Sequence, residues 1–156
     1  LRLSRIALHA RTGKQQYKGH PDLEAFQGFY ELCQHPLYYN GGIESLSDIR
    51  QILIRFPLLK GVFIGRGLLS SPLLAKEFKG NETFLPEQRM SIYFAFHEEL
   101  FSAYSQVLQG ETQLLVKMKT LWEYFLPETD RKLLKRIKKS TRLQQYTESV
   151  KAIFTS

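Results

Sequence analysis

The sequence predicts an α/β segment over residues 1–80, followed by an all-α segment that forms a small helical bundle over residues 81–156. In the first segment, short apolar runs alternate with stretches of helical apolar spacing at intervals of roughly 25–30 residues, which is typical of consecutive βα units on a parallel sheet. After Gly80 the apolar residues keep a helical period, and no further run has the character of a strand. This change of pattern places the boundary at residues 79–86.

Three βα units are expected in the first segment. Their strands are predicted at residues 6–9, 37–39 and 62–64, and residues 22–33 have the apolar spacing of an amphipathic helix. Ser45, with Asp48 three residues later, predicts a capping box at the start of the second helix. Pro72 predicts the first turn of the third helix. Three units are too few to close an eight-stranded barrel, which usually needs about 250 residues.

Four helices are expected in the second segment. They are predicted at residues 86–109, 114–125 and 129–139, and from a Thr141-x-x-Gln144 capping box towards Phe154. Gly110 is expected to end the first of these helices. Trp122 is expected in the core of the bundle and Tyr124 at its rim.

Composition limits the classes of protein to which the chain can belong. No apolar run approaches the ~20 residues that cross a bilayer, so no membrane helix is expected. Cys33 is the sole cysteine, which excludes an intrachain disulfide and a cysteine cluster for zinc, and no metal site is expected. A reducing, cytoplasmic compartment fits this cysteine usage. The net charge of +7 and the pI near 9.5 favour a polyanionic partner.

The positive charge is concentrated near the C-terminus. Residues 131–142 contain no acidic residue and seven basic ones: Arg131, Lys132, Lys135, Arg136, Lys138, Lys139 and Arg142. Such a run is either the solvated face of an amphipathic helix or a surface that contacts phosphate groups. Seven cations without an interspersed acid exceed what solubility requires, and the charge pattern alone leaves both interpretations open.

Two glycine motifs directly follow predicted strands: Asn40-Gly41-Gly42 after the second, and Gly65-Arg66-Gly67 after the third. Glycine lets backbone N–H groups approach phosphate oxygens, and Arg66 adds a charge-assisted contact. Either motif alone could serve only a tight turn. Because the carboxyl ends of parallel strands meet at one edge of a sheet, the pair favours a phosphate site. His9 closes the first strand at the corresponding place and is a candidate ligand-facing donor.

Three segments resemble the tRNA-dihydrouridine synthase family in their order and spacing: HARTGKQQYKG at residues 9–19, YNGGI at residues 39–43 and FIGRGLLSSP at residues 63–72. The resemblance covers nearly the whole chain, because that family continues from an FMN-binding barrel into a helical domain that binds tRNA. It implies that residues 1–80 are the last three or so βα units of a TIM (β/α)8 barrel. Residues 81–156 would be the tRNA-binding bundle.

The resemblance also implies a cofactor and a reaction. The residues that would hold FMN are His9, Asn40, Gly41, Gly42, Gly65 and Arg66. In the family, NADPH reduces FMN, and the flavin passes a hydride to a uracil extruded from the tRNA, which yields 5,6-dihydrouridine. The family's catalytic cysteine belongs to a segment expected upstream of Leu1. No catalytic residue is therefore expected in this chain, which would need the N-terminal half of the same protein, and Cys33 is expected to be an inert packing residue.

For tRNA, the resemblance favours backbone contacts by the seven basic residues of 131–142. Second candidates are Arg11, Lys14 and Lys18 on the loop after the first strand, with Tyr17 as a stacking platform for RNA. Two alternatives to the flavoenzyme stay open. One is a non-catalytic RNA-binding module. The other is half of another FMN-dependent barrel oxidoreductase, such as a dihydroorotate-dehydrogenase-like flavoprotein. It is disfavoured because such an enzyme does not need a basic helical segment after its barrel.

Overall fold

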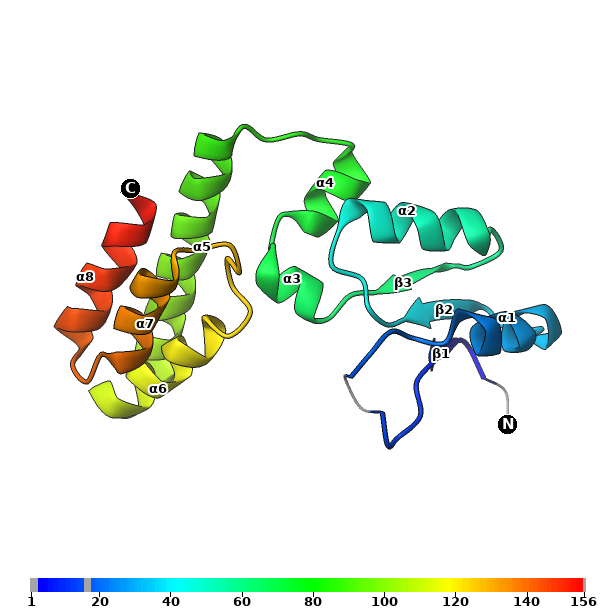
Figure 1. Cartoon of the computed structure of the whole chain (residues 1–156), viewed down its shortest axis with the longest axis horizontal. Helices are drawn as coiled ribbons and strands as arrows, with labels where there is room; N and C mark the ends of the chain where they lie inside the picture. Colours follow the sequence, from blue (N-terminus) through cyan, green and yellow to red (C-terminus); the bar gives the residue numbers. More distant parts are fainter. Residues whose placement is uncertain (1–2, 16–17, 156) are drawn as a thin grey trace.

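The computed structural model describes residues 3–15 and 18–155. Its sheet and its helical bundle lie at opposite ends of the molecule, with two short helices between them (Figure 1). The order of the described elements is β1, α1, β2, α2, β3 and then α3 to α8 without a further strand. Among these residues, no helix combines the length and apolarity needed to cross a membrane.

The sheet consists of three parallel strands in the order β1-β2-β3. They are β1 (Ile6–His9), β2 (Leu37–Asn40) and β3 (Gly61–Phe63), so the third begins one residue earlier than predicted. His9 pairs with Asn40, and Asn40 pairs with Phe63. The carboxyl ends of all three strands are therefore level, and the loops that follow them start from one edge of the sheet.

Helices α1 (Leu23–Leu32) and α2 (Leu46–Arg55) connect the strands, and both begin at side-chain caps. The capping box predicted for Ser45 and Asp48 is confirmed. A core of aromatic rings fills the space under these helices, where the Phe26 ring lies 4.9 Å from the rings of both Tyr39 and Phe56.

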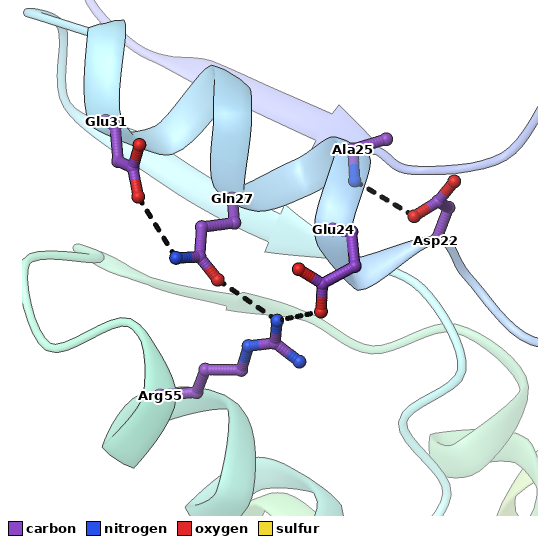
Figure 2. A network of polar contacts seen from close by, with 6 residues as sticks. All are labelled: Asp22, Glu24, Ala25, Gln27, Glu31 and Arg55. Atoms are coloured by element: carbon purple, nitrogen blue, oxygen red, sulfur yellow. Dashed lines mark hydrogen bonds and ion pairs between the residues drawn. The ribbon is translucent and has the colours of Figure 1, made fainter.

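Polar contacts also join α1 to α2 (Figure 2). Arg55 Nη2 donates to Glu24 Oε1 at 2.5 Å and to Gln27 Oε1 at 3.0 Å. This group is exposed, so it contributes little to stability, and the aromatic core carries most of the packing energy.

The chain forms two short helices after β3, α3 (Arg66–Ser70) and α4 (Leu74–Gly80). The predicted start of the third helix at Pro72 is therefore wrong. A first helix already begins at Arg66, and the second begins at Leu74. The physical reason is that glycine has a low helix propensity, so Gly65-Arg66-Gly67 looks like a turn in isolation. Close packing of Gly67 on the neighbouring loop holds this helix in place.

The bundle contains α5 (Pro86–Val107), α6 (Glu111–Leu121), α7 (Arg131–Lys139) and α8 (Leu143–Phe154). Their apolar faces meet in one buried cluster that includes Met118, Trp122, Phe125 and Ile137. The core position predicted for Trp122 is confirmed.

Two local predictions for the bundle are wrong. The Thr141-x-x-Gln144 capping box does not form: Gln145 Oε1 accepts from the Thr141 amide, and Arg142 is the N-cap of α8 without a side-chain cap bond. One more residue in the turn makes Gln145, not Gln144, the side chain within reach. Gly110, with φ of 86°, opens α6 instead of ending α5, which stops at Val107.

Candidate functional site

A cavity of about 340 Å³ lies where the three level strand ends meet. It is lined by all six residues that the sequence predicts for cofactor binding: His9, Asn40, Gly41, Gly42, Gly65 and Arg66. They come from the ends of the three strands and from the residues that follow, and the parallel register of the sheet brings these strand ends together. The structure thus places the two glycine motifs and the histidine in one site.

His9 is fixed in the cavity wall by a hydrogen bond across the sheet. Its Nδ1 lies 2.8 Å from the carbonyl oxygen of Asn40. A carbonyl oxygen can only accept, so Nδ1 carries the proton and the neutral ring has its lone pair on Nε2. This tautomer leaves Nε2 as the nitrogen that can accept from a ligand, so the neutral ring is an acceptor and not the ligand-facing donor that the sequence predicted.

The glycine turn after β2 has a conformation that favours glycine. Gly42 has φ of 59°, in the left-handed region that L side chains rarely adopt. An added Cβ there would also meet the Pro21 ring at 3.1 Å. In contrast, a Cβ on Gly65 would meet no atom within 4 Å, so the cavity is open beside the second motif.

Arg11, predicted as a contact for tRNA, lines this cavity as well. Its Nη2 donates to the Gly19 carbonyl at 2.9 Å, while its Nε is buried without a hydrogen-bond partner among the described atoms. Arg11 therefore stands with the six cofactor candidates. Lys14 and Lys18 are exposed on the same loop, and Tyr17 lies outside the described residues.

Three lining residues were not singled out from the sequence: Ile43, Glu44 and Phe63. Phe63 lies in the predicted third strand, and 45% of its surface is exposed; its ring meets the Tyr38 ring edge-on, with 5.6 Å between the ring centroids. Its position next to the second glycine motif, as the last residue of β3, is the signal that could have found it. It gives the cavity an aromatic wall.

The charges around the cavity suit an anion with an aromatic part. The guanidinium groups of Arg11 and Arg66 outnumber the single carboxylate, Glu44, among the lining residues. Behind the wall, burial raises the pKa of Tyr39. Arg11 opposes this shift and Asp48 adds to it, and the phenol stays neutral. The two guanidinium groups suit a phosphate, and the open space beside Gly65 and the exposed Phe63 ring suit an aromatic ring. Together they fit a phosphorylated aromatic cofactor such as FMN.

A second basic surface lies on the bundle. The four basic residues Lys132, Lys135, Arg136 and Lys139 line a groove of about 440 Å³, together with Gln145, Glu148 and Ser149 of α8. We call this the α7–α8 groove. Arg131, Lys138 and Arg142 are exposed but are not part of its lining. The run of seven cations therefore divides into four that border one groove and three that lie elsewhere on the surface.

Cys33 is far from a position in which it could take part in chemistry at the cavity. It is the C-cap of α1, before the start of β2, whereas the cavity lies past the ends of the strands. Its thiol is half-buried and lies 3.6 Å from the His35 carbonyl oxygen. Within the part of the chain that the structure describes, no cluster of three or more His, Cys, Asp or Glu could hold a metal ion.

Comparison with known proteins identifies the family. The family model described as dihydrouridine synthase matches residues 3–155, which is nearly the entire chain. The chain belongs to the dihydrouridine synthase family. The three parallel strands with their connecting helices are compatible with part of the barrel that this family implies.

Two curated relatives are similar to part of this chain. A probable tRNA-dihydrouridine synthase of Aquifex aeolicus (strain VF5) is 34% identical over 77 residues, which is 49% of this chain and 24% of that protein. A probable tRNA-dihydrouridine synthase of Rhizobium leguminosarum bv. phaseoli is 36% identical over 67 residues, 43% of this chain and 21% of that protein. The matched stretches thus span less than a quarter of each relative.

Proposed function

We propose that this chain is the C-terminal part of a flavin-dependent tRNA-dihydrouridine synthase, which reduces uridine to 5,6-dihydrouridine in tRNA. The cavity would hold the FMN phosphate and its neighbouring atoms, and the α7–α8 groove would hold the tRNA backbone. The observation that carries this proposal is that one cavity gathers all six predicted cofactor residues from the ends of three strands. Family membership supports the reaction class.

Each residue of the cavity would have a role in binding. Arg66 would pair with the phosphate, and backbone N–H groups of the two glycine motifs would complete the phosphate contacts. His9, held through Nδ1 by Asn40, would present Nε2 to the flavin. When bound, FMN would carry the hydride that NADPH supplies. We assign no catalytic residue to this chain, and the proton donor would come from the N-terminal half of the protein.

Phosphate recognition gives a direct test of the cavity. We expect the chain to bind FMN more tightly than riboflavin, because only FMN carries the phosphate that Arg66 would contact. Quenching of flavin fluorescence on titration measures both affinities. Arg66→Gln should reduce FMN affinity to the level of riboflavin, and Arg50→Gln, an exposed change on α2, should leave it unchanged. Equal affinity for FMN and riboflavin in the native chain would contradict the proposal.

A non-catalytic RNA-binding module is the second candidate, because the α7–α8 groove lies on the bundle, apart from the cavity. The same titration separates the two functions. A chain that binds tRNA but neither flavin would favour the module. Another FMN-dependent barrel oxidoreductase is disfavoured by the family match and by the basic bundle.

A further inference from the structure

The α/β part and the bundle are joined by a polar network in which Glu77 and Tyr93 are buried and Ser71 and Arg89 are half-buried. Glu77 of α4 is only 3% exposed and is ion-paired with Arg89 of α5. Carboxylates are almost never buried in this way unless they are paired. The ion pair therefore ties α4 to the beginning of α5, across the linker of residues 81–85.

Arg89 extends the network to a second contact between the two parts. Its Nη1 donates to the hydroxyl oxygen of Tyr93, one turn further along α5, at 3.3 Å. That hydroxyl lies 2.7 Å from Ser71 Oγ, in the turn between α3 and α4. The four residues Ser71, Glu77, Arg89 and Tyr93 thus form a chain that starts and ends on the α3–α4 segment and passes through α5. We call it the junction network.

Apolar and backbone contacts surround this network. Leu73, which precedes α4, is 4% exposed and belongs to the buried cluster of the bundle. The Leu126 amide donates to the Ser70 carbonyl at 3.4 Å. Leu126 has φ of 48°, a left-handed conformation that is uncommon for residues other than glycine. Several independent contacts therefore fix the same junction.

The junction lies between the two proposed binding surfaces. Helix α3 begins at Arg66, in the cavity wall, and ends at Ser70, which accepts from Leu126. Leu126 lies in the connection between α6 and α7, and five residues further on Arg131 begins α7. A rotation at the junction would change how the α7–α8 groove faces the cavity.

We infer that the junction network positions the bundle: Ser71, Glu77, Arg89 and Tyr93 hold the α7–α8 groove at one fixed orientation to the cavity. This inference rests on the proposed function, since a tRNA held by the groove could then present only certain uridines to the cavity. A buried ion pair often gives little net stability compared with apolar residues of similar volume. Its directional hydrogen bonds select one geometry, whereas apolar packing alone allows neighbouring ones.

Distance measurements between two spin labels test this inference on the free 156-residue chain. In a Cys33→Ser background, labels at Arg50→Cys on α2 and Val116→Cys on α6 report the separation of the two parts by pulsed electron paramagnetic resonance. We expect one narrow distance. Tyr93→Phe, which removes a single hydroxyl, should broaden or shift that distance, and so should the double change Glu77→Met with Arg89→Met.

Matched controls exist within the chain. Tyr104→Phe removes a hydroxyl from the same helix, outside the junction, and Glu24→Met with Arg55→Met removes an ion pair inside the α/β part. Both should keep the narrow distance. If the double junction variant does not fold by circular dichroism, Tyr93→Phe decides the outcome. An unchanged narrow distance in folded Tyr93→Phe would overturn the inference.

Ligand binding distinguishes this inference from the proposed function. Each variant should keep the FMN and tRNA affinities of the reference chain, because the cavity and the groove stay intact. Loss of the narrow distance with both affinities retained supports a positioning role. A chain that binds neither ligand would refute the proposed function, while the label distances would still decide the role of the junction network.

Discussion

The buried histidine of the bundle is part of a fully satisfied hydrogen-bond chain. His97 Nδ1 lies 3.1 Å from the Glu98 carboxylate, which can only accept, so Nδ1 carries the proton. Its Nε2 then accepts from the Tyr146 hydroxyl at 2.6 Å, and the Tyr146 oxygen accepts from Trp122 Nε1 at 2.9 Å. Burial raises the pKa of Tyr146, which keeps the phenol protonated. The chain connects three helical segments of the bundle.

Tyr146→Phe should therefore destabilise the bundle. The change leaves the Trp122 N–H and the His97 Nε2 buried without a partner, and each such group costs about 1–3 kcal/mol. Urea unfolding monitored by circular dichroism measures the loss in free energy of unfolding. Tyr104→Phe, at a half-buried position, should change it by less than about 0.5 kcal/mol. Equal effects of the two variants would show that the hydrogen-bond chain contributes nothing.

His97 should also make stability depend on pH. Burial lowers the pKa of His97 below 6.5, and the Glu98 carboxylate opposes this only in part. The neutral ring is thus favoured in the folded state. Its contribution to stability is complete above pH 6.5 and is lost as the pH falls through the lower folded pKa, by up to about 1.4 kcal/mol per pH unit.

Unfolding free energies between pH 7.5 and 5 provide the measurement. His97→Gln should flatten the decline towards acid, and His20→Gln, at an exposed histidine, should leave it as steep as in the native chain. A decline of the same slope in His97→Gln would mean that other groups cause it.

At this residue scale, the sequence predicted the six cofactor candidates but not all of their neighbours. The six stand at strand ends, and strand ends can be recognised from local pattern. The cavity positions of Arg11 and Phe63 depend on how a loop folds back and on which face of β3 is left open. Neither is a local property of the sequence.

Among the elements, α3 depends on a close approach that only glycine permits. A Cβ at Gly67 would lie 2.3 Å from the Ile43 carbonyl oxygen, and the backbone would have to move. Gly67→Ala should thus destabilise the chain by about 1–3 kcal/mol, and should weaken FMN binding because Ile43 lines the cavity. Thermal unfolding and the flavin titration measure both effects.

Gly28→Ala is the matched control for this change. Gly28 lies inside α1, where an added Cβ would meet no atom within 4 Å. Alanine there should stabilise the helix by about 0.5–1 kcal/mol. Equal destabilisation by both substitutions would contradict the close packing assigned to α3.

Helix starts were predicted correctly where neighbouring residues alone determine them, and wrongly where the turn or tertiary packing decides. The capping box of Ser45 and Asp48 is confirmed, because both partners lie within one turn at the spacing that the motif requires. The box predicted at Thr141 is wrong, because an extra residue in the turn transfers the bond to Gln145. Helix α3 was missed, because packing of its first turn outweighs the low helix propensity of glycine.

On the scale of the whole molecule, the junction network could not be predicted from the sequence. Glu77 and Arg89 belong to different helices, and nothing local indicates that the linker brings them together. The groove on the bundle is likewise a tertiary feature. The sequence indicated seven cations in one run, but the partner helix α8 determines which four of them border a groove.

This division of the cations gives a test of tRNA binding in which the two variants have the same net charge. Arg136→Gln with Lys139→Gln removes two charges from the α7–α8 groove, and Arg131→Gln with Lys138→Gln removes two from elsewhere on the same helix. Each double variant lowers the net charge from +7 to +5 (7 − 2 = 5). A surface that acts only through net charge would be weakened equally by both.

We expect the groove variant to lose more affinity for tRNA than its counterpart. Each lost phosphate contact should reduce the steepness of the plot of log affinity against log salt concentration by about 1. The slope of the groove variant should therefore become shallower by about 2, and the slope of the other variant should hardly change. Fluorescence anisotropy of labelled tRNA over a range of salt concentrations measures these slopes. Equal slopes for the two variants would refute the groove as the binding site, because position along α7 would then have no effect on phosphate contact.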